Sequence, residues 1–347
     1  MTEKGTPPKR RKKVTIYDIA EAAGVAPSTV SRAFARPGRV HSDTAQLIHE
    51  TANRLGYRAK PITRHEQGVA TNVLAFVAAD IANPVFAHIM KGFQMEAAIH
   101  GYTVLLIDTE EDATKEREGV NRVIHMVDGV VLAASRLSDS AINQIVKVRP
   151  VISVNRIIAG LPSIVADTAR GMRRTVEHLA SRGHERFAYL SGPPASWADG
   201  VRWRAVSEAC HELSLTVRRV GPNVPSLDGG VQAARLWAEH PTTAVIGYND
   251  VMAIGFMKAI QRSGLRVPQD VSVVGVDNSI SSVLTTPTLT SVAPSTSQIG
   301  VRAARALITQ LRHRSTPSAE TIVVPMELFV RESIGPARSH PPVMEKK

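Results

Sequence analysis

Residues 27–34 place small hydroxyl side chains and one arginine on one side of a predicted helix. Val30, Ala33 and Phe34 recur at helical spacing and would face inward. The opposite side carries Ser28, Thr29, Ser31 and Arg32. Hydroxyl groups hydrogen-bond to phosphate oxygens and base edges, and an arginine guanidinium can donate two hydrogen bonds to guanine. This side therefore has the chemistry of a helix that enters the major groove of duplex DNA.

Two further short helices flank this one. Apolar residues three or four positions apart predict a first helix that ends at Gly24, and they are Ile16, Ile19, Ala20 and Ala23. Pro37 and Gly38 interrupt the chain before a third helix, whose apolar side carries Leu47, Ile48, Ala52 and Leu55. Two short helices joined by a tight turn that contains glycine form a helix-turn-helix. A three-helix bundle with an ordinary polar surface is the alternative interpretation.

Positive charge is concentrated in the same part of the chain. The net charge is +11 over 347 residues, and residues 1–65 hold 13 lysines and arginines against five acidic residues. Such a field attracts polyanions, and release of counterions from nucleic acid usually supplies the binding energy. The charge favours DNA binding over the ordinary bundle, although the basic run at residues 9–13 is, by itself, equally consistent with a solvated tail.

The sequence after Gly68 alternates between apolar runs of strand length and helical periods. Predicted strands include residues 73–78, 103–107, 129–132, 151–154, 187–190, 244–246 and 271–276. Predicted helices include residues 85–100, 168–182, 201–213, 227–240 and 250–263. Strict alternation implies parallel sheets with helices on both faces, because each crossover must pass over the sheet. The run is too long for one small sheet, so we expect two similar lobes.

Polar side chains gather directly after these strands, where open parallel sheets bind ligands. They include Asp80, Asn83, Asn155, Arg156, Asp167, Asn249, Asp250, Asp277 and Asn278. Converging hydrogen-bonding groups suit a polyhydroxylated or heterocyclic ligand, and Phe86 offers a flat apolar face. For any single Asp or Asn, a helix N-cap is as good an interpretation as ligand contact.

Several protein classes are disfavoured by what the sequence lacks. Cys210 is the single cysteine, which excludes a disulfide framework and cysteine-based metal sites and fits a reducing, cytoplasmic compartment. No apolar stretch has membrane-spanning length or the form of a signal core. Phosphate-loop, serine-hydrolase and zinc-protease motifs are absent, so we expect no enzyme, no cofactor and no metal. His178 and His184 are better explained as a helix-face residue and a cap than as metal ligands.

The segment Val14 to Tyr57 closely resembles the DNA-binding head of the LacI/GalR family of bacterial repressors. The family pattern V-T-x-x-D-V-A-x-x-A-G-V-S-x-x-T-V-S-R is matched at nearly every fixed position, with Ile19 for Val and Ala26 for Ser. The resemblance implies that Pro27, Ser28 and Arg32 read bases. It implies that phosphates are contacted mainly by Thr15, Tyr17, Thr29 and Ser31.

The linker that follows departs from the family pattern. The family usually continues with a hinge helix that folds on operator DNA and pushes a leucine into the minor groove. Here residues 59–66 read Ala-Lys-Pro-Ile-Thr-Arg-His-Glu, and Arg64 alone keeps its place as an expected DNA contact. Lys60 is a poor N-cap. Glu66 carries a carboxylate and so cannot serve as an apolar wedge, and the phosphates lining the narrow groove would repel it.

We therefore expect operator DNA bound by this protein to be less kinked at its centre than family operators, or to be kinked by a different wedge such as Ile62. The bend angle of the bound operator is the measurement that checks this. An angle equal to the strongly kinked family value would contradict it.

The resemblance extends through most of the remaining chain. Motifs of the family's repressor body are N-P-V-F, V-D-G-V-V-L, H-L-A-S-R-G-H-E-R, T-A-V-I-G-Y-N-D-V-M-A-I-G, V-P-Q-D-V-S-V-V-G-V-D-N and P-T-L-T-S-V. Family ligand positions correspond to Phe86, Asn155, Asp167, Arg202, Asn249 and Asp277. Pro225 and Ser226 stand where the family often has an aromatic lid, which leaves the identity of the ligand open.

Together these observations predict an all-α helix-turn-helix head plus an α/β two-lobed body like a periplasmic binding protein, with two parallel sheets flanked by helices. The expected divisions are a basic disordered arm at 1–13, the head at 14–58, a hinge at 59–71, the effector and dimerisation domain at 72–331, and a disordered tail at 332–347. The expected function is a repressor that binds double-stranded operator DNA as a homodimer and is controlled by a sugar, polyol or nucleoside. A solute-binding protein and an architectural DNA binder without a ligand are the alternatives.

Overall fold

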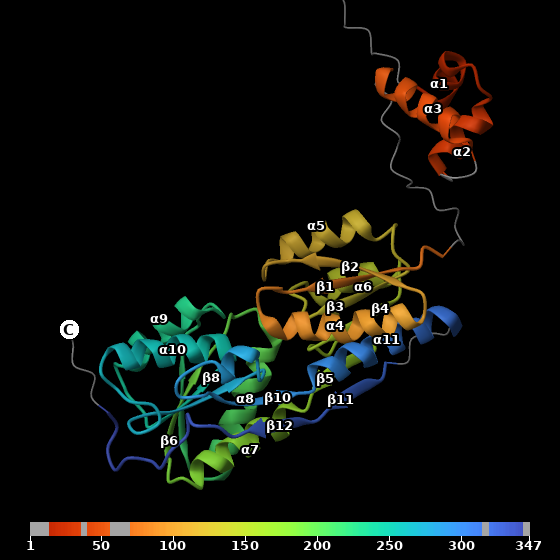
Figure 1. The fold of residues 1–347 in the computed structure, drawn as a ribbon. Coiled ribbons are helices and arrows are strands. Elements are labelled where there is room, and N and C mark those ends of the chain that lie inside the picture. The colour runs from red at the N-terminus through yellow and green to blue at the C-terminus, as the bar shows by residue number, and fades with distance from the viewer. Residues whose placement is uncertain (1–13, 36–39, 56–69, 314–318, 343–347) are drawn as a thin grey trace, which may run out of the picture. The chain divides into compact units, whose positions relative to one another are not determined.

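The computed structural model describes residues 14–35, 40–55, 70–313 and 319–342. The chain separates into two compact units, Met1–Val69 and Ala70–Lys347, shown in Figure 1. The hinge residues discussed above, Arg64 and Glu66 among them, lie outside the described residues.

The first unit contains three helices, α1 (Ile16–Ala23), α2 (Pro27–Ala35) and α3 (Ser42–Arg54). A capping box between Thr15 and Asp18 begins α1, and Gly24 ends it in the left-handed conformation at φ 66°. The small core consists of Ile19, Ala20, Val30, Ala33, Ile48 and Ala52. The predicted helix-turn-helix is confirmed, with the second helix beginning at Pro27.

The first lobe of the body is built on a six-stranded parallel sheet in the order β11-β5-β4-β3-β1-β2. Its strands are β1 (Val73–Ala78), β2 (Thr103–Asp108), β3 (Gly129–Ala133), β4 (Val151–Val154), β5 (Ser163–Ala166) and β11 (Thr321–Val324). Its helices are α4 (Pro84–Ile99), α5 (Ala113–Val123), α6 (Asp139–Val146) and α11 (Thr296–His313). Separate apolar cores lie on the two faces of the sheet.

Helices α4 and α11 lie side by side over one face of this sheet (Figure 1). Their backbones approach so closely that a Cβ atom on Gly300 would collide with the carbonyl oxygen of Ile89. A Cβ atom on Gly92 would likewise collide with the carbonyl oxygen of Ser297. Glycine at these two positions therefore sets the distance between the helices.

The second lobe repeats the design with the strand order β12-β10-β9-β8-β6-β7, in which β12 alone is antiparallel to its neighbour. Its strands are β6 (Arg186–Leu190), β7 (Thr216–Val220), β8 (Ala244–Gly247), β9 (Ser272–Val276), β10 (Thr290–Pro294) and β12 (Met326–Phe329). Its helices are α7 (Thr168–Ala180), α8 (Trp197–Glu212), α9 (Leu227–Trp237), α10 (Asp250–Arg262) and the short η1 (Ile280–Val283). The predicted pair of α/β lobes is confirmed.

The chain passes between the lobes at three places: after β5, after β10 and after β11. Each lobe therefore contains segments that are distant in sequence. The first crossing is held by Asp167, whose backbone N–H donates to the carbonyl oxygen of Val324 at 2.8 Å and whose side chain caps α7.

The expectation of a disordered tail from residue 332 is wrong for residues 332–342. Ser333 and Ile334 are buried, and the Ser333 hydroxyl donates to the carbonyl oxygen of Val273 at 2.6 Å. The Gly335 N–H donates to the Ser272 hydroxyl at 3.0 Å. Three prolines in this stretch and the two lysines at the end of the chain indicated a solvated tail, but the hydrogen-bonding partners lie on β9, about sixty residues earlier in the chain. Residues 343–347 lie outside the described residues.

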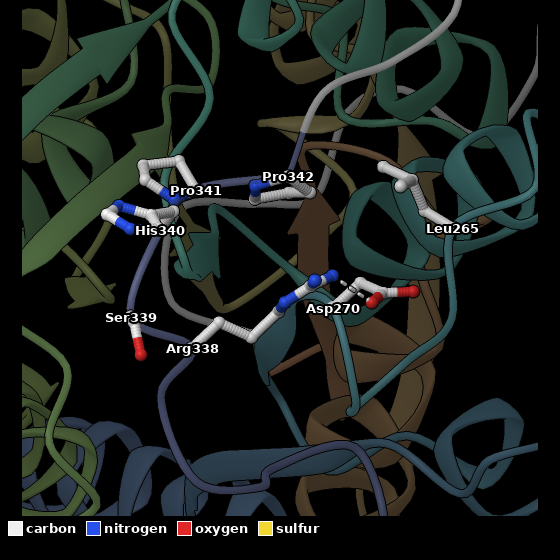
Figure 2. A pocket seen from close by; sticks show the side chains of 7 residues that line it. All are labelled: Leu265, Asp270, Arg338, Ser339, His340, Pro341 and Pro342. Carbon is white, nitrogen blue, oxygen red and sulfur yellow. Dashed lines mark hydrogen bonds and ion pairs between the residues drawn. The ribbon is translucent and has the colours of Figure 1, made fainter.

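His184 also binds this C-terminal segment. Its Nδ1 lies 2.9 Å from the Thr243 hydroxyl, and its Nε2 lies 3.2 Å from the carbonyl oxygen of Gly335. Farther along, Arg338 points to the carboxylate of Asp270 and forms an ion pair with it (Figure 2). Burial lowers the pKa of His184, so the imidazole is neutral at pH 7 and suits these neutral partners.

We expect Ser333→Ala to lower the free energy of unfolding of the body by about 1–3 kcal/mol, because the Thr290 N–H and the Val273 carbonyl lose a buried partner. Ser339→Ala, at an exposed position of the same segment, is the control. Urea unfolding followed by tryptophan fluorescence measures the effect, since all three tryptophans lie in the second lobe. Equal unfolding midpoints for the two variants would mean that the segment does not contribute to the native fold.

Candidate nucleic-acid interface and ligand cleft

The outer side of α2 carries the residues predicted to contact DNA. Pro27, Ser28, Ser31 and Arg32 are exposed, while Thr29 is half-buried. Val30 and Ala33, on the inner side, are buried in the core of the bundle. The structure thus brings the predicted base readers together on one accessible helix face.

Two predicted phosphate contacts lie at the start of α1. The side chain of Tyr17 is 67% exposed. The Thr15 hydroxyl donates to the Asp18 carboxylate at 2.7 Å, and the Thr15 N–H donates to the same oxygen at 2.6 Å. Thr15 therefore serves the helix N-cap as well as remaining exposed.

Arg202 on α8 is the centre of a second polar group, at the carboxyl ends of the strands of the second lobe. Its Nη1 donates to the carbonyl oxygen of Tyr248 at 2.7 Å, and its guanidinium lies 4.8 Å from the centroid of the Tyr248 ring. Its Nη2 lies 3.6 Å from a carboxylate oxygen of Asp277. Asn83 of the first lobe lies close enough to the same carboxylate to lower its pKa. The predicted residues Asn83, Arg202 and Asp277 therefore lie close together, although they come from different lobes.

Asp277 is an unusual carboxyl group in two respects. Its backbone φ of 111° is in the region that side chains rarely adopt, which is a form of strain often found at functional sites. Burial, with a smaller contribution from the nearby Asp250, raises its pKa to about 7, although Arg202 and Asn83 oppose the shift. Burial likewise raises the pKa of Asp250 to about 6.

The remaining predicted ligand residues have structural roles of their own. Asn249 is fully buried and caps α10 by accepting a hydrogen bond from the Met252 N–H at 2.8 Å, while its Nδ2 has no partner. Asp167 caps α7. Asn155 follows β4 in a left-handed conformation at φ 58°. Phe86 is 6% exposed and packs into the core of the first lobe, so it does not form an open flat face.

The structure adds positioning residues that sequence reasoning missed. Asp199 accepts hydrogen bonds from the Tyr189 hydroxyl at 2.9 Å and the Gly192 N–H at 2.7 Å, and it pairs with Arg219. The Ser196 and Tyr248 hydroxyl groups lie 2.9 Å apart. These bonds fix the loop after β6 and the Tyr248 ring beneath Arg202. One sequence feature could have indicated this arrangement, namely the run Ser-Gly-Pro-Pro directly after a strand. Its glycine, Gly192, lies so close to the Tyr248 ring that a Cβ atom there would collide with the ring.

A cavity of about 520 Å³ opens between the lobes. Its described lining consists of Asp80, Glu110, Glu111, Pro193, Pro194, Pro222, Asn223, Val224, Pro225 and Ser226. The first three residues belong to the first lobe and the rest to the second. A small molecule in this space would contact both lobes, as in other clefts of open α/β sheets.

The described ranges were compared with the requirements of a membrane-spanning helix and of a metal site. No helix there has the length and apolar character needed to cross a membrane. No three His, Cys, Asp or Glu side chains there are grouped so as to hold a metal ion.

Comparison with known proteins assigns both units. The family described as bacterial regulatory proteins, lacI family, matches residues 15–60, and the periplasmic binding protein-like domain matches residues 176–334. The transcriptional regulator DegA of Bacillus subtilis is 30% identical over 93% of this chain and 99% of its own. The transcriptional repressor CytR of Escherichia coli is 28% identical over 94% of this chain and 97% of its own.

A solved structure supports the assignment of both units. The transcriptional regulator CelR in complex with cellobiose has a TM-score of 0.69 and 25% identity, covering 92% of this chain and 100% of that one. These relatives are transcriptional regulators, not enzymes. This chain belongs to the LacI family of bacterial regulatory proteins.

Proposed function

We propose that this protein is a transcriptional repressor that binds a pseudo-palindromic operator as a homodimer and responds to a small molecule held between the lobes of its body. The observation that carries the proposal is the exposed face of α2, where Ser28, Ser31 and Arg32 stand together on a folded helix-turn-helix. A helix of this kind presents its polar side to the edges of bases in the major groove.

On this proposal, the DNA contacts divide into two sets. Pro27, Ser28 and Arg32 contact bases, while Thr15, Tyr17, Thr29 and Ser31 contact phosphates and fix the register. The positive charge of the first 65 residues strengthens binding to any duplex, so sequence preference must come from the first set.

Exposed apolar side chains on the body support a homodimer. In the first lobe they lie on α4 and the edge strand β2, and in the second on and beside η1: Met95, Ile99, Leu106, Ile280, Val283 and Leu284. Ile99 and Leu284 are each 75% exposed. A partner subunit could cover these apolar groups, and a two-fold dimer would hold two heads for the two halves of one operator.

Regulation would depend on Asn83 and Asp277, which lie near each other on the two lobes. A small molecule that bonds to Asp277 and Arg202 competes with Asn83 for the carboxylate and changes the balance between two arrangements of the lobes. Such a ligand alters DNA binding only if its affinity differs between the two arrangements. The cellobiose complex of the regulator CelR supports a small-molecule effector.

Arg32→Ala should reduce the preference for the cognate operator over random duplex by about 1–3 kcal/mol, because a bidentate contact to guanine is lost. Arg235→Ala, an exposed arginine on α9 of the body, removes the same charge outside the head and is the control. The operator is first selected from a random DNA library, and both affinities are then measured at physiological salt. Full sequence preference in the Arg32 variant would overturn the proposal.

Asp277→Asn should stabilise the body relative to the wild type increasingly as pH rises from 5 to 8. Folding raises the pKa of Asp277 from its usual value of 3.8 to about 7. Between these two pH values Asp277 is ionised in the unfolded chain but protonated in the folded protein, so the free energy of unfolding of the wild type falls as pH rises. Asparagine carries no proton to lose, and the difference between the proteins grows by at most about 1.4 kcal/mol per pH unit until pH 7.

Urea unfolding at several pH values measures this difference. Asp228→Asn, at an exposed carboxylate of α9, is the matched control and should show no such trend. A difference between Asp277→Asn and the wild type that is constant over this pH range would show that Asp277 ionises normally in the folded protein.

A further inference from the structure

A groove of about 590 Å³ lies on the first lobe between helices α5 and α6. Val120 of α5 and Ile142 of α6 belong to one apolar core, so the two helices cover the same face of the sheet. Among the described residues, none lines both this groove and the cavity between the lobes. A molecule in the groove would therefore leave the cleft free for another ligand.

The two helices that form the groove run in the same direction. Helix α5 joins β2 to β3, and α6 joins β3 to β4. These three strands are parallel to one another within the sheet. Each helix must therefore return the chain from the carboxyl end of one strand to the amino end of the next. The start of α5 thus lies at the same end of the groove as the start of α6.

The end of the groove at the helix starts is polar and positively charged. Arg117, in the second turn of α5, lines it together with Ser138 and Ser140 at the start of α6, and all three are exposed. Among the described residues, Arg117 has no hydrogen-bond or ion-pair partner. The neighbouring Asp139 is paired with Arg156 and is not part of the lining. This end of the groove is therefore complementary to an anion.

The two serine hydroxyl groups can assist such an anion. Their oxygen atoms lie 3.0 Å apart, so one hydroxyl donates to the other. The Ser138 hydroxyl also accepts the Ala141 N–H at 3.3 Å. Two hydroxyl groups carry two protons, and the bond between them uses one. The second proton is available to a carboxylate that is paired with Arg117.

The opposite end of the groove is apolar. Val120 and Ile124 line it toward the end of α5, and Ile145 and Val148 line it toward the end of α6. The first three are buried, whereas the side chain of Val148 is 46% exposed. Seven residues separate Arg117 from Ile124, which corresponds to about 10 Å along a helix. A ligand that fills the groove must therefore carry its charge at one end and apolar groups over the rest of its length.

We propose that this groove binds a small carboxylate with an unbranched hydrocarbon chain, as in a medium-chain fatty acid. The carboxylate pairs with Arg117 and accepts a hydrogen bond from Ser138 or Ser140, and the chain extends between the helices toward Val148. The volume of the groove lies within the range of about 300–1,000 Å³ that is usual for small-molecule sites. It favours a small molecule over a helix of a partner protein.

Isothermal titration of the full-length protein with hexanoate, octanoate and decanoate, each kept below its micelle-forming concentration, tests the proposal. Each further methylene group that is buried should tighten binding about threefold to fourfold, so decanoate should bind at least about tenfold more tightly than hexanoate. The alcohol 1-octanol has a similar chain without the carboxylate, and it should bind about threefold to tenfold more weakly than octanoate. No binding of decanoate, an affinity independent of chain length, or equal binding of octanoate and 1-octanol overturns the proposal.

Two substitutions on one helix locate the carboxylate. Arg117→Gln should weaken octanoate binding about threefold to tenfold and leave 1-octanol binding unchanged, because only the acid needs the cation. Arg122→Gln removes the same charge from an exposed position of α5 that is not part of the lining, and it is the matched control. Octanoate affinities that are equal in the two variants would place the fatty acid elsewhere on the protein and overturn the proposal.

A third substitution locates the chain. Val148→Asp puts a charge at the apolar end, where the valine side chain is partly exposed, and it should weaken octanoate and 1-octanol alike. Thermal unfolding of each variant checks that the fold is retained. Binding of both ligands that is unaffected by Val148→Asp in a folded protein would contradict the proposed path of the chain. None of these measurements involves DNA, so they are independent of the proposed function.

Discussion

The three crossings between the sheets are the constraint on which the architecture of the body depends. They occur after β5, β10 and β11, so each lobe is completed by strands that the chain reaches only after it has built part of the other lobe. Because the strands are mainly parallel, their carboxyl ends lie at one edge of each sheet. These edges lie near each other, since Asn83 of one lobe is among the groups that lower the pKa of Asp277 in the other. A narrow connection of this kind allows two rigid lobes to change their separation while the sheets keep their register.

Burying Arg202 and Asp277 in the cleft costs free energy, which the rest of the body must offset. Arg202 is surrounded by Tyr248 and Asp277, and the carboxyl group beside it is buried enough for its pKa to reach about 7. Burying charged groups is unfavourable unless they are paired and hydrogen-bonded. The Asp199 network fixes the adjacent loop and so maintains the geometry around Arg202. On the proposed function, a ligand with suitable hydrogen-bonding groups would relieve part of this cost, and its binding would thereby be coupled to the arrangement of the lobes.

Much of the fold could be predicted from periodicity, and much of the site could not. The start of α2 at Pro27 and the alternation of buried strands with helices were visible because apolar spacing reports burial directly. The edge strand β7, with its two arginines, and the charged helix α5 lack a strong apolar pattern and were not predicted. The role of Asp199 depends on segments that meet only in the folded chain. The C-terminal segment was misread for the same reason, since its partners on β9 are distant in sequence.

The return of the last residues to the second lobe has a consequence for synthesis on the ribosome. Residues 14–55 have all the contacts of their own small core as soon as they emerge, whereas the second lobe lacks the partners of Ser272 and Val273 until residues 333–335 have been translated. The first lobe similarly waits for α11 and β11. A prematurely terminated polypeptide would thus carry a finished DNA-reading module attached to an incomplete regulatory body. Such a fragment would be free of effector control, and quality-control proteases would have exposed apolar surface by which to remove it.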